Sequence, residues 1–174
     1  MSNIGVDMKI LVFSDSHGAG HYIRDAIQKH EGRADALVFL GDGATDAHAV
    51  FREFPDIPSY IVRGNCDGFS NEVEEQVFEL GGWRFFICHG HRYQVKSTYQ
   101  PVYYRGLELG ADFVLFGHTH QAMYEEGDVT LINPGSVSSF NLRFDSASWG
   151  LLTLSEKKSE NFLRKYEKKT CQNI

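Results

Sequence analysis

Five short apolar runs in this sequence each end directly before residues that can bind a metal ion. The runs are rich in β-branched and aromatic residues, which is typical of buried strands. In open α/β sheets ligands bind beyond the carboxyl ends of the strands, so a parallel sheet would gather these residues at one edge. The five segments are FSDSH (Asp15, His17), FLGD (Asp42), VRGN (Asn65), ICHGH (His89, His91) and LFGHTH (His118, His120).

The order of the segments predicts an α/β fold. Strand and helix alternate in the first half, which is the pattern of a parallel sheet. We expect strands at Met8–Phe13, Ala36–Leu40 and Ser59–Val62, and helices at His21–His30 and Ala44–Phe54.

The second half mixes hairpins with a helix, which indicates two sheets packed together with helices outside. Gly81-Gly82 predicts a hairpin turn between two strands. The expected strands are Glu75–Glu79, Trp83–Cys88, Asp112–Phe116, Gln121–Tyr124, Val129–Ile132, Trp149–Ser155 and Asn161–Tyr166, with a helix around Tyr103–Leu109.

Length and composition limit the class of protein. The 174 residues suit one domain spanning 1–174. A net charge of −6 argues against a nucleic-acid-coating protein, so we expect no nucleic-acid partner. There is neither an apolar run long enough to span a bilayer nor a signal-peptide pattern, so we expect no membrane association. Residues 1–7 are either a disordered extension or precede an alternative start at Met8.

The cysteines favour a reducing compartment. Cys66, Cys88 and Cys171 are odd in number and form no CxxC pair, so a disulfide framework is not expected. We therefore expect a cytoplasmic protein, and we leave open whether it forms a homo-oligomer.

The candidate ligands are more informative together than singly. Asp42 or Asn65 alone would suit a turn, and Asp15-x-His17 a helix N-cap beside a surface histidine. His118 and His120 are alternate residues of an extended segment, face the same way and favour a chelate. Five of the eight histidines follow buried strands, which turn and surface roles do not explain.

The types of ligand indicate the metal and the chemistry. Imidazole, carboxylate and amide groups suit divalent Mn, Fe, Zn or Ni. Seven ligands are too many for one ion but suit two ions that share a bridging carboxylate, an arrangement that clamps a phosphoryl group. Such a site stays locally positive, which favours a small anionic phosphate-ester substrate.

Taken together, these motifs resemble those of the calcineurin-like metallophosphoesterases from about residue 8 to 155. The short chain, Gly64-Asn65-Cys66-Asp67 and Asn133–Ser136 most resemble the small, single-domain YfcE-like phosphodiesterases. The resemblance implies a four-layer αββα sandwich of two mixed sheets, the metallo-dependent phosphatase fold.

The resemblance also implies roles for the ligands. Manganese is the usual activating metal of such relatives. The implied reaction is hydrolysis of a phosphate ester, a diester rather than a monoester, by a hydroxide that bridges the two ions. The alternative is a catalytically weak protein-binding scaffold, like the retromer subunit of this fold. One ion would be held by Asp15, His17 and His120, the other by Asn65, His89 and His118, with Asp42 as the bridge.

Three further residues are candidates for the catalytic group, and one of them departs from the family. Many relatives have a histidine where this chain has Cys66, and a thiol gives up its proton less readily near neutral pH. His91 either replaces that acid or is a supporting or surface histidine. Asp67 is expected to orient neighbours by hydrogen bonds rather than to react. Asn133–Ser136 either forms a tight turn only or also supports the GHTH loop.

Overall fold

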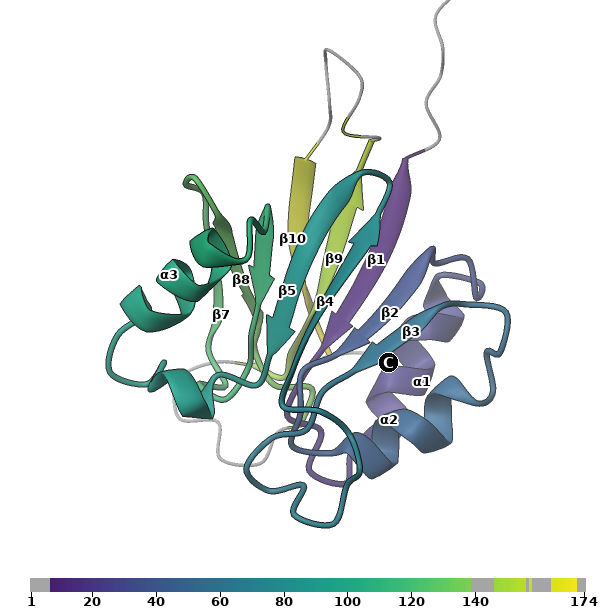
Figure 1. The fold of residues 1–174 in the computed structure, drawn as a ribbon. Helices are drawn as coiled ribbons and strands as arrows, with labels where there is room; N and C mark the ends of the chain where they lie inside the picture. Colours follow the sequence, from purple (N-terminus) through teal and green to yellow (C-terminus); the bar gives the residue numbers. More distant parts are fainter. Residues whose placement is uncertain (1–6, 139–145, 156, 158–163, 172–174) are drawn as a thin grey trace, which may run out of the picture.

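Two mixed five-stranded sheets pack face to face in this computed structural model, and helices cover their outer faces (Figure 1). This arrangement confirms the predicted αββα sandwich. The structure describes residues 7–138, 146–155, 157 and 164–171, so all but Asp7 of the predicted N-terminal extension lies outside the described residues. None of the helices in these ranges is long and apolar enough to cross a membrane.

The first sheet has the order β10-β9-β1-β2-β3. Its strands β1, β2 and β3 run parallel, as the alternating pattern predicted. Strand β9 pairs antiparallel with β1, and β10 pairs antiparallel with β9 as a hairpin. Both α1 and α2 pack on its outer face. The elements are β1 (Met8–Phe13), α1 (Gly20–Lys29), β2 (Ala36–Phe39), α2 (Ala44–Phe51), β3 (Ser59–Ile61), β9 (Ser148–Leu154) and β10 (Arg164–Thr170).

The second sheet has the order β4-β5-β6-β8-β7. The two predicted hairpins are present as β4–β5 and β7–β8, and β5, β6 and β8 run parallel. The helix α3 packs on its outer face. The elements are β4 (Glu75–Leu80), β5 (Trp83–Cys88), the 3₁₀ helix η1 (His91–Tyr93), α3 (Gln100–Glu108), β6 (Phe113–Leu115), β7 (Ala122–Glu125) and β8 (Thr130–Pro134).

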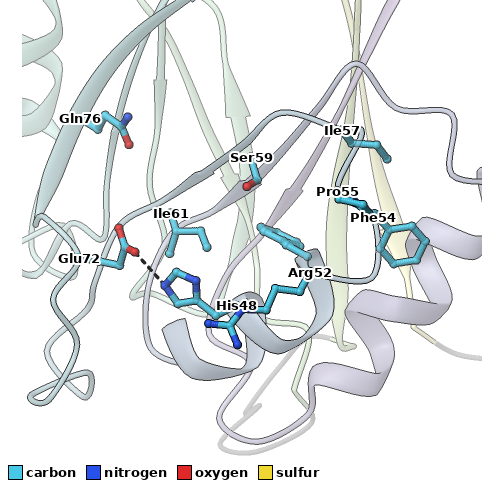
Figure 2. A pocket seen from close by; sticks show the side chains of 10 residues that line it. His48, Arg52, Phe54, Pro55, Ile57, Ser59, Ile61, Glu72 and Gln76 are labelled. Atoms are coloured by element: carbon cyan, nitrogen blue, oxygen red, sulfur yellow. Dashed lines mark ion pairs between the residues drawn. The ribbon is translucent and has the colours of Figure 1, made fainter.

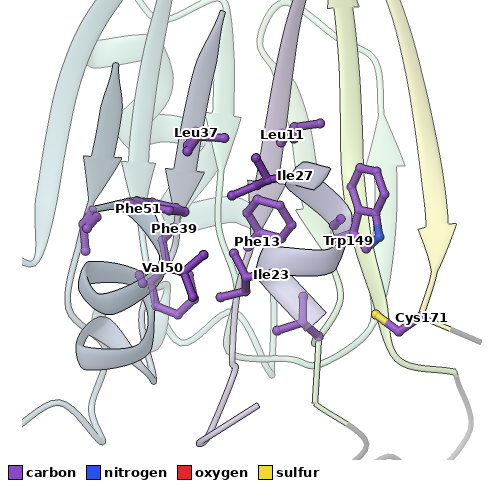
Figure 3. Packing of buried hydrophobic residues seen from close by; sticks show 14 of the residues in the cluster. Leu11, Phe13, Ile23, Ile27, Leu37, Phe39, Val50, Phe51, Trp149 and Cys171 are labelled. Carbon is purple, nitrogen blue, oxygen red and sulfur yellow. The ribbon is translucent and has the colours of Figure 1, made fainter. Parts of the chain in front are cut away.

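Alternate residues of β1 serve two different cores, which explains its continuous apolar sequence. Ile10 and Val12 face the second sheet, whereas Leu11 and Phe13 face the helices. Figure 3 shows the outer core, where Phe13 lies with residues of both helices and with Trp149 of β9. With both faces buried, β1 is fixed rigidly beneath the loop that follows it.

The parallel strands end at a common edge of the sandwich. In Figure 1 the arrows of β1, β2 and β5 end at the lower side of the molecule. The loops that carry all the predicted ligands start there.

Element ends differ from prediction for identifiable reasons. Helix α2 ends at Phe51 rather than Phe54, since Pro55 disfavours a helical conformation for the residue before it. Helix α3 begins at Gln100, with Pro101 in the first turn where proline is favoured. Strand β10 continues to Thr170, beyond the predicted end at Tyr166, while positions 161–163 lie outside the described residues.

Candidate metal centre

The predicted ligands lie on five loops at the carboxyl-end edge. Six of them fall into two groups whose potential ligand atoms lie within 4.8 Å of one another. The first group is Asp15, His17 and His120, and the second is Asp42, His89 and His118. The first group is the ligand set that the sequence implied for one ion, and the second contains two of the three ligands implied for the other ion, with Asp42 beside them. A third such group, of His17, Asp42 and Cys66, overlaps the first two.

Asp15 presents one carboxylate oxygen that the protein leaves unsatisfied. Its Oδ2 accepts hydrogen bonds from the Ser14 hydroxyl (2.5 Å) and the His118 backbone N–H (3.1 Å). Its Oδ1 is buried without a hydrogen-bond partner among the described residues, 3.1 Å from Nε2 of His120. A buried charged oxygen without a partner is costly, so a bound cation fits this position.

Asp42 lies between the two groups. Its Oδ1 accepts the Cys66 backbone N–H at 2.8 Å. Its Oδ2 lies 3.3 Å from Nε2 of His89 and 3.9 Å from Nε2 of His17. One oxygen is therefore directed at histidines from both groups, which is the position that a bridging ligand needs.

Buried carboxylates make the centre attractive to positive charge. Burial alone would raise the pKa of Asp42, but its hydrogen bond with His89 and the charge on that ring hold the pKa well below its usual range. Burial alone would lower the pKa of His89, but Asp42 and Asp15 raise it overall. The carboxylates thus favour a cation here, whether a proton or a metal ion.

The surroundings set the tautomer of His89 and the charge of His118 in the second group. His89 Nδ1 lies 2.6 Å from the Leu40 carbonyl, which can only accept, so the ring donates there and directs Nε2 into the centre. Burial and the charge of His89 lower the pKa of His118 to about 4. His118 is therefore neutral near pH 7, the form that binds metal.

Backbone strain concentrates in the predicted ligands. Residues other than glycine rarely adopt positive φ, and such residues cluster at functional sites. Five of the seven do so here: Asp15 (55°), His17 (43°), Asp42 (59°), His118 (68°) and His120 (58°). The fold therefore maintains unfavourable conformations to direct these side chains.

Two glycines next to ligands provide space rather than a sharp turn. A Cβ at Gly64 would collide with Oδ1 of Asp42, and one at Gly117 would collide with the Ser14 hydroxyl. Gly41 instead has a φ of 96°, a turn conformation that favours glycine, whereas Gly64 and Gly117 permit a close approach of neighbouring loops.

Asp67 organises the loops by accepting hydrogen bonds. Its carboxylate takes four backbone N–H groups at 2.7–3.0 Å, from Asp42, Gly43, Ala44 and Gly64. It thereby ties the β2–α2 loop, which carries Asp42, to the β3–β4 loop, which carries Asn65. This geometry agrees with the expected orienting role.

Asn65, Cys66 and His91 lie at the rim of the centre. The side chain of Asn65 is exposed, with Nδ2 3.4 Å from Sγ of Cys66. Burial and the neighbouring Asp42 raise the pKa of Cys66 to about 11, so it stays a thiol. The His91 ring centroid lies 5.5 Å from that of His89, and its buried Nδ1 has no hydrogen-bond partner among the described residues. Burial, followed by the charge of His89, lowers its pKa.

Several supporting residues were not identified from the sequence. Ser16 and Gly18 both donate to the carboxylate of Asp46, at 2.6 and 2.8 Å. An acidic residue in the first turn of a helix is a recognised signal that would have drawn attention to it. Ser14 gives a weaker signal, as a polar residue directly after an apolar run.

Asn133 supports the GHTH loop, the second of the two alternatives for Asn133–Ser136. Its amide donates to the Gly117 carbonyl (2.9 Å) and to the Thr119 hydroxyl (3.0 Å). Ser136 donates to the Asp15 carbonyl at 2.8 Å. The segment therefore connects β8 to both loops of the first ligand group.

Comparison with known proteins agrees with this geometry. Residues 8–157 match the model of the calcineurin-like phosphoesterase superfamily domain. The probable metallophosphoesterase YsnB of Bacillus subtilis is 35% identical over 149 residues, covering 84% of this chain and 85% of the relative. The phosphodiesterase MJ0936 of Methanocaldococcus jannaschii is 30% identical over 151 residues, covering 76% and 86% respectively.

Solved structures share the fold. A predicted phosphoesterase from Streptococcus pneumoniae superposes with a TM-score of 0.80 at 25% identity, covering 95% of this chain and 91% of that one. Vps29 of Entamoeba histolytica, in complex with zinc, superposes with a TM-score of 0.70 at 20% identity, covering 95% and 100%. At that identity the likeness to Vps29 shows the fold alone.

Proposed function

Because this chain belongs to the calcineurin-like phosphoesterase superfamily, we propose that it hydrolyses phosphodiesters at a site that holds two divalent metal ions. The observation that carries the proposal is the pair of buried carboxylates. Asp15 keeps one oxygen unsatisfied beside His120, and Asp42 directs one oxygen at His17 and His89. The name of the relative MJ0936, a phosphodiesterase, supports the substrate class.

The donor set supports the choice of metal. Imidazole nitrogens and carboxylate oxygens match Mn, Zn, Fe or Ni, and we propose Mn²⁺ first. When bound, such ions polarise the phosphoryl oxygens and make water a better nucleophile. One ion would be held by Asp15, His17 and His120, and the other by Asn65, His89 and His118. Asp42 would contribute to both.

The residues around the ligands keep the centre in a fixed geometry for the reaction. The Leu40 carbonyl fixes the tautomer of His89, and Asp67 holds the backbone of Asp42 in place. Such preorganisation is a large part of catalytic stabilisation, because charged groups need not move as charge develops. Asp67 is therefore a positioning residue in this proposal.

The leaving oxygen needs a proton, and we assign His91 as its donor. Cys66 stands where many relatives have a histidine, and its raised pKa leaves it a weak acid. His91 lies beside His89 and His118 and keeps Nδ1 without a hydrogen-bond partner in the described part of the chain. An unpartnered ring nitrogen is available to exchange a proton with substrate.

The test measures nitrophenolate released from bis(4-nitrophenyl) phosphate and inorganic phosphate released from alkyl monoesters, each with and without Mn²⁺. We expect metal-dependent turnover, faster for the aryl diester, because an aryl leaving group departs readily as an anion. Equal rates for the alkyl monoesters would contradict the diester preference. No turnover of any phosphate ester by metal-saturated protein would contradict the proposed activity.

The second candidate is a protein-binding scaffold of the same fold. Retention of all seven ligand positions favours the enzyme, because a scaffold has no need of strained, buried ligands. The scaffold predicts metal binding without turnover over a panel of mono- and diesters. We also propose that the substrate is a small phosphate ester and that the protein is cytoplasmic.

A further inference from the structure

One large apolar side chain is held in solvent three residues after Cys66, which lies at the rim of the centre. Phe69 is as exposed as in an isolated peptide (106%), whereas the next most exposed large hydrophobic residue among those described, Tyr104, reaches 62%. Folding gains nothing from a ring that stays in water. Single exposed hydrophobic residues are common, so the exposure alone would carry little weight.

The segment that carries Phe69 is firmly anchored on both sides. Before it, Asp67 accepts four backbone N–H groups, and its carbonyl accepts the Ser70 N–H at 2.9 Å. After it, the Arg63 N–H donates to the Val73 carbonyl at 2.9 Å. The ring is therefore displayed from a fixed backbone, which reduces the entropy that binding would cost.

An ion pair joins this segment to helix α2, which packs on the first sheet. Glu72 lies 2.8 Å from His48 of α2, and Figure 2 shows this pair among the residues that line a pocket beside α2 and β3. The pocket is about 410 Å³ in volume and open on one side. The contact fixes the segment against α2, the helix that begins two residues after Asp42.

Phe69 follows the rim residue Cys66 by three positions, so the chain limits how far it can lie from the centre. Sγ of Cys66 is within 4.8 Å of ligand atoms of His17 and Asp42. Three residues of chain limit the separation of the Cys66 and Phe69 Cα atoms to about 11 Å. A bound diester whose organic group faces the exposed rim, where Asn65 and Cys66 lie, would direct that group toward this segment.

We propose that Phe69 determines substrate specificity by stacking on an aromatic ring of the diester, either an aryl group or a nucleobase. Aromatic rings favour offset or edge contacts with one another, and such contacts are selective for rings over alkyl groups. The inference rests on the proposed phosphodiesterase function and adds the class of organic group to it.

The kinetic test compares esters that share a leaving group. Methyl, phenyl and thymidine 5′-(4-nitrophenyl) phosphates all release nitrophenolate, so their chemistry is matched. Phe69→Ala should raise KM for the phenyl or the thymidine ester about three- to tenfold, the size of one aromatic contact, and leave kcat and the methyl ester unchanged. Phe69→Tyr should keep the preference, and Tyr104→Ala, on α3, should change none of the three esters.

A binding measurement separates this inference from the proposed activity. If the parent releases no nitrophenolate from any ester, the activity fails, and calorimetry of Mn²⁺-loaded protein with phenylphosphonate and methylphosphonate then decides about Phe69. A preference for phenylphosphonate that Phe69→Ala removes would support stacking of Phe69 on the aromatic group of the ligand. Equal or absent binding of the two phosphonates, or equal KM changes for all esters, would overturn it. So would a loss of self-association in Phe69→Ala with ester preference intact, because Phe69 would then be a contact between copies.

Discussion

Asp42 is the residue whose single side chain reaches both groups of predicted ligands. Its Oδ2 faces His89 at 3.3 Å and His17 at 3.9 Å. We predict that Asp42→Ala removes turnover, with a fall beyond the roughly 10–100-fold typical of losing a group that only supports a ligand. Metal content measured on the purified variant should fall from about two ions per chain. Near-parental turnover with two ions retained would show that Asp42 is no bridge.

Cys66 provides a comparison for the Asp42 variant, because it contacts the Asp42 carboxylate but has no assigned role as a metal ligand. Its backbone N–H donates to Oδ1 of Asp42, and that bond survives truncation of the side chain. We predict that Cys66→Ala keeps most of the parental kcat/KM. Losing a true general acid typically costs about 10²–10⁴-fold. A collapse of that size with metal content intact would make the thiol the acid.

His91 should matter in proportion to how poorly the leaving group departs. An aryl group leaves readily as an anion, whereas an alkoxide needs a proton. We predict that His91→Ala lowers kcat/KM for alkyl esters about 10²–10⁴-fold and for nitrophenyl esters much less. The measurement uses matched aryl and alkyl diesters at saturating Mn²⁺. Equal losses for both classes would mean that His91 supports the site but donates no proton.

At the scale of elements, the sequence predicted strands better than loops. Apolar runs such as Met8–Phe13 identify buried strands, because both faces of the strand are covered. The helix η1 at His91–Tyr93 was missed, since three residues carry no periodicity. Helix ends moved where Pro55 and Pro101 restrict the backbone.

For the candidate site, the sequence predicted which residues take part but not which contacts they make. Histidines and aspartates at strand ends indicated a ligand set from the sequence alone. The sequence contains no sign that Asp67 accepts four backbone N–H groups, because three of the donors lie 23–25 residues away from it in the chain. Nor does it show the positive φ of Asp15 or Asp42, which is set by tertiary contacts.

Asp67 connects the β2–α2 loop to the β3–β4 loop, so its substitution tests how much this connection stabilises the fold. We predict that Asp67→Ala lowers the free energy of unfolding by about 2–4 kcal/mol, because several N–H groups lose a charged acceptor. Urea denaturation measures this, with an unchanged m-value showing a shift in stability alone. Asp35 accepts one backbone N–H in an exposed position, so Asp35→Ala should cost about 1 kcal/mol or less. Similar costs for the two variants would contradict the coupling.

At the scale of the whole molecule, the candidate centre joins the two sheets. Asp15, His17, Asp42 and Asn65 follow strands of the first sheet, whereas His89, His118 and His120 follow strands of the second. Beneath them a shared apolar core, including Val12 and Ile87, packs sheet on sheet. Ions held by ligands from both sheets would therefore crosslink the sandwich at its carboxyl-end edge.

This crosslink predicts that metal stabilises the entire fold. The ligands are together only in the folded state, so a metal at about 100 times its Kd should add about 2.7 kcal/mol to the free energy of unfolding. For a chain of this size that raises Tm by about 5–10 °C. Calorimetric scans with Mn²⁺ and with a chelator measure the difference.

Two variants make that thermal measurement specific to the centre. Asp42→Ala should show almost no rise in Tm with Mn²⁺, because both groups of ligands lose their shared carboxylate. Asp35→Ala lies on the exposed surface and should show the full parental rise. A rise that persists in Asp42→Ala would place the stabilising metal elsewhere on the protein. No rise in the parent, at Mn²⁺ concentrations that saturate binding measured separately, would mean that the metal does not hold the two sheets together.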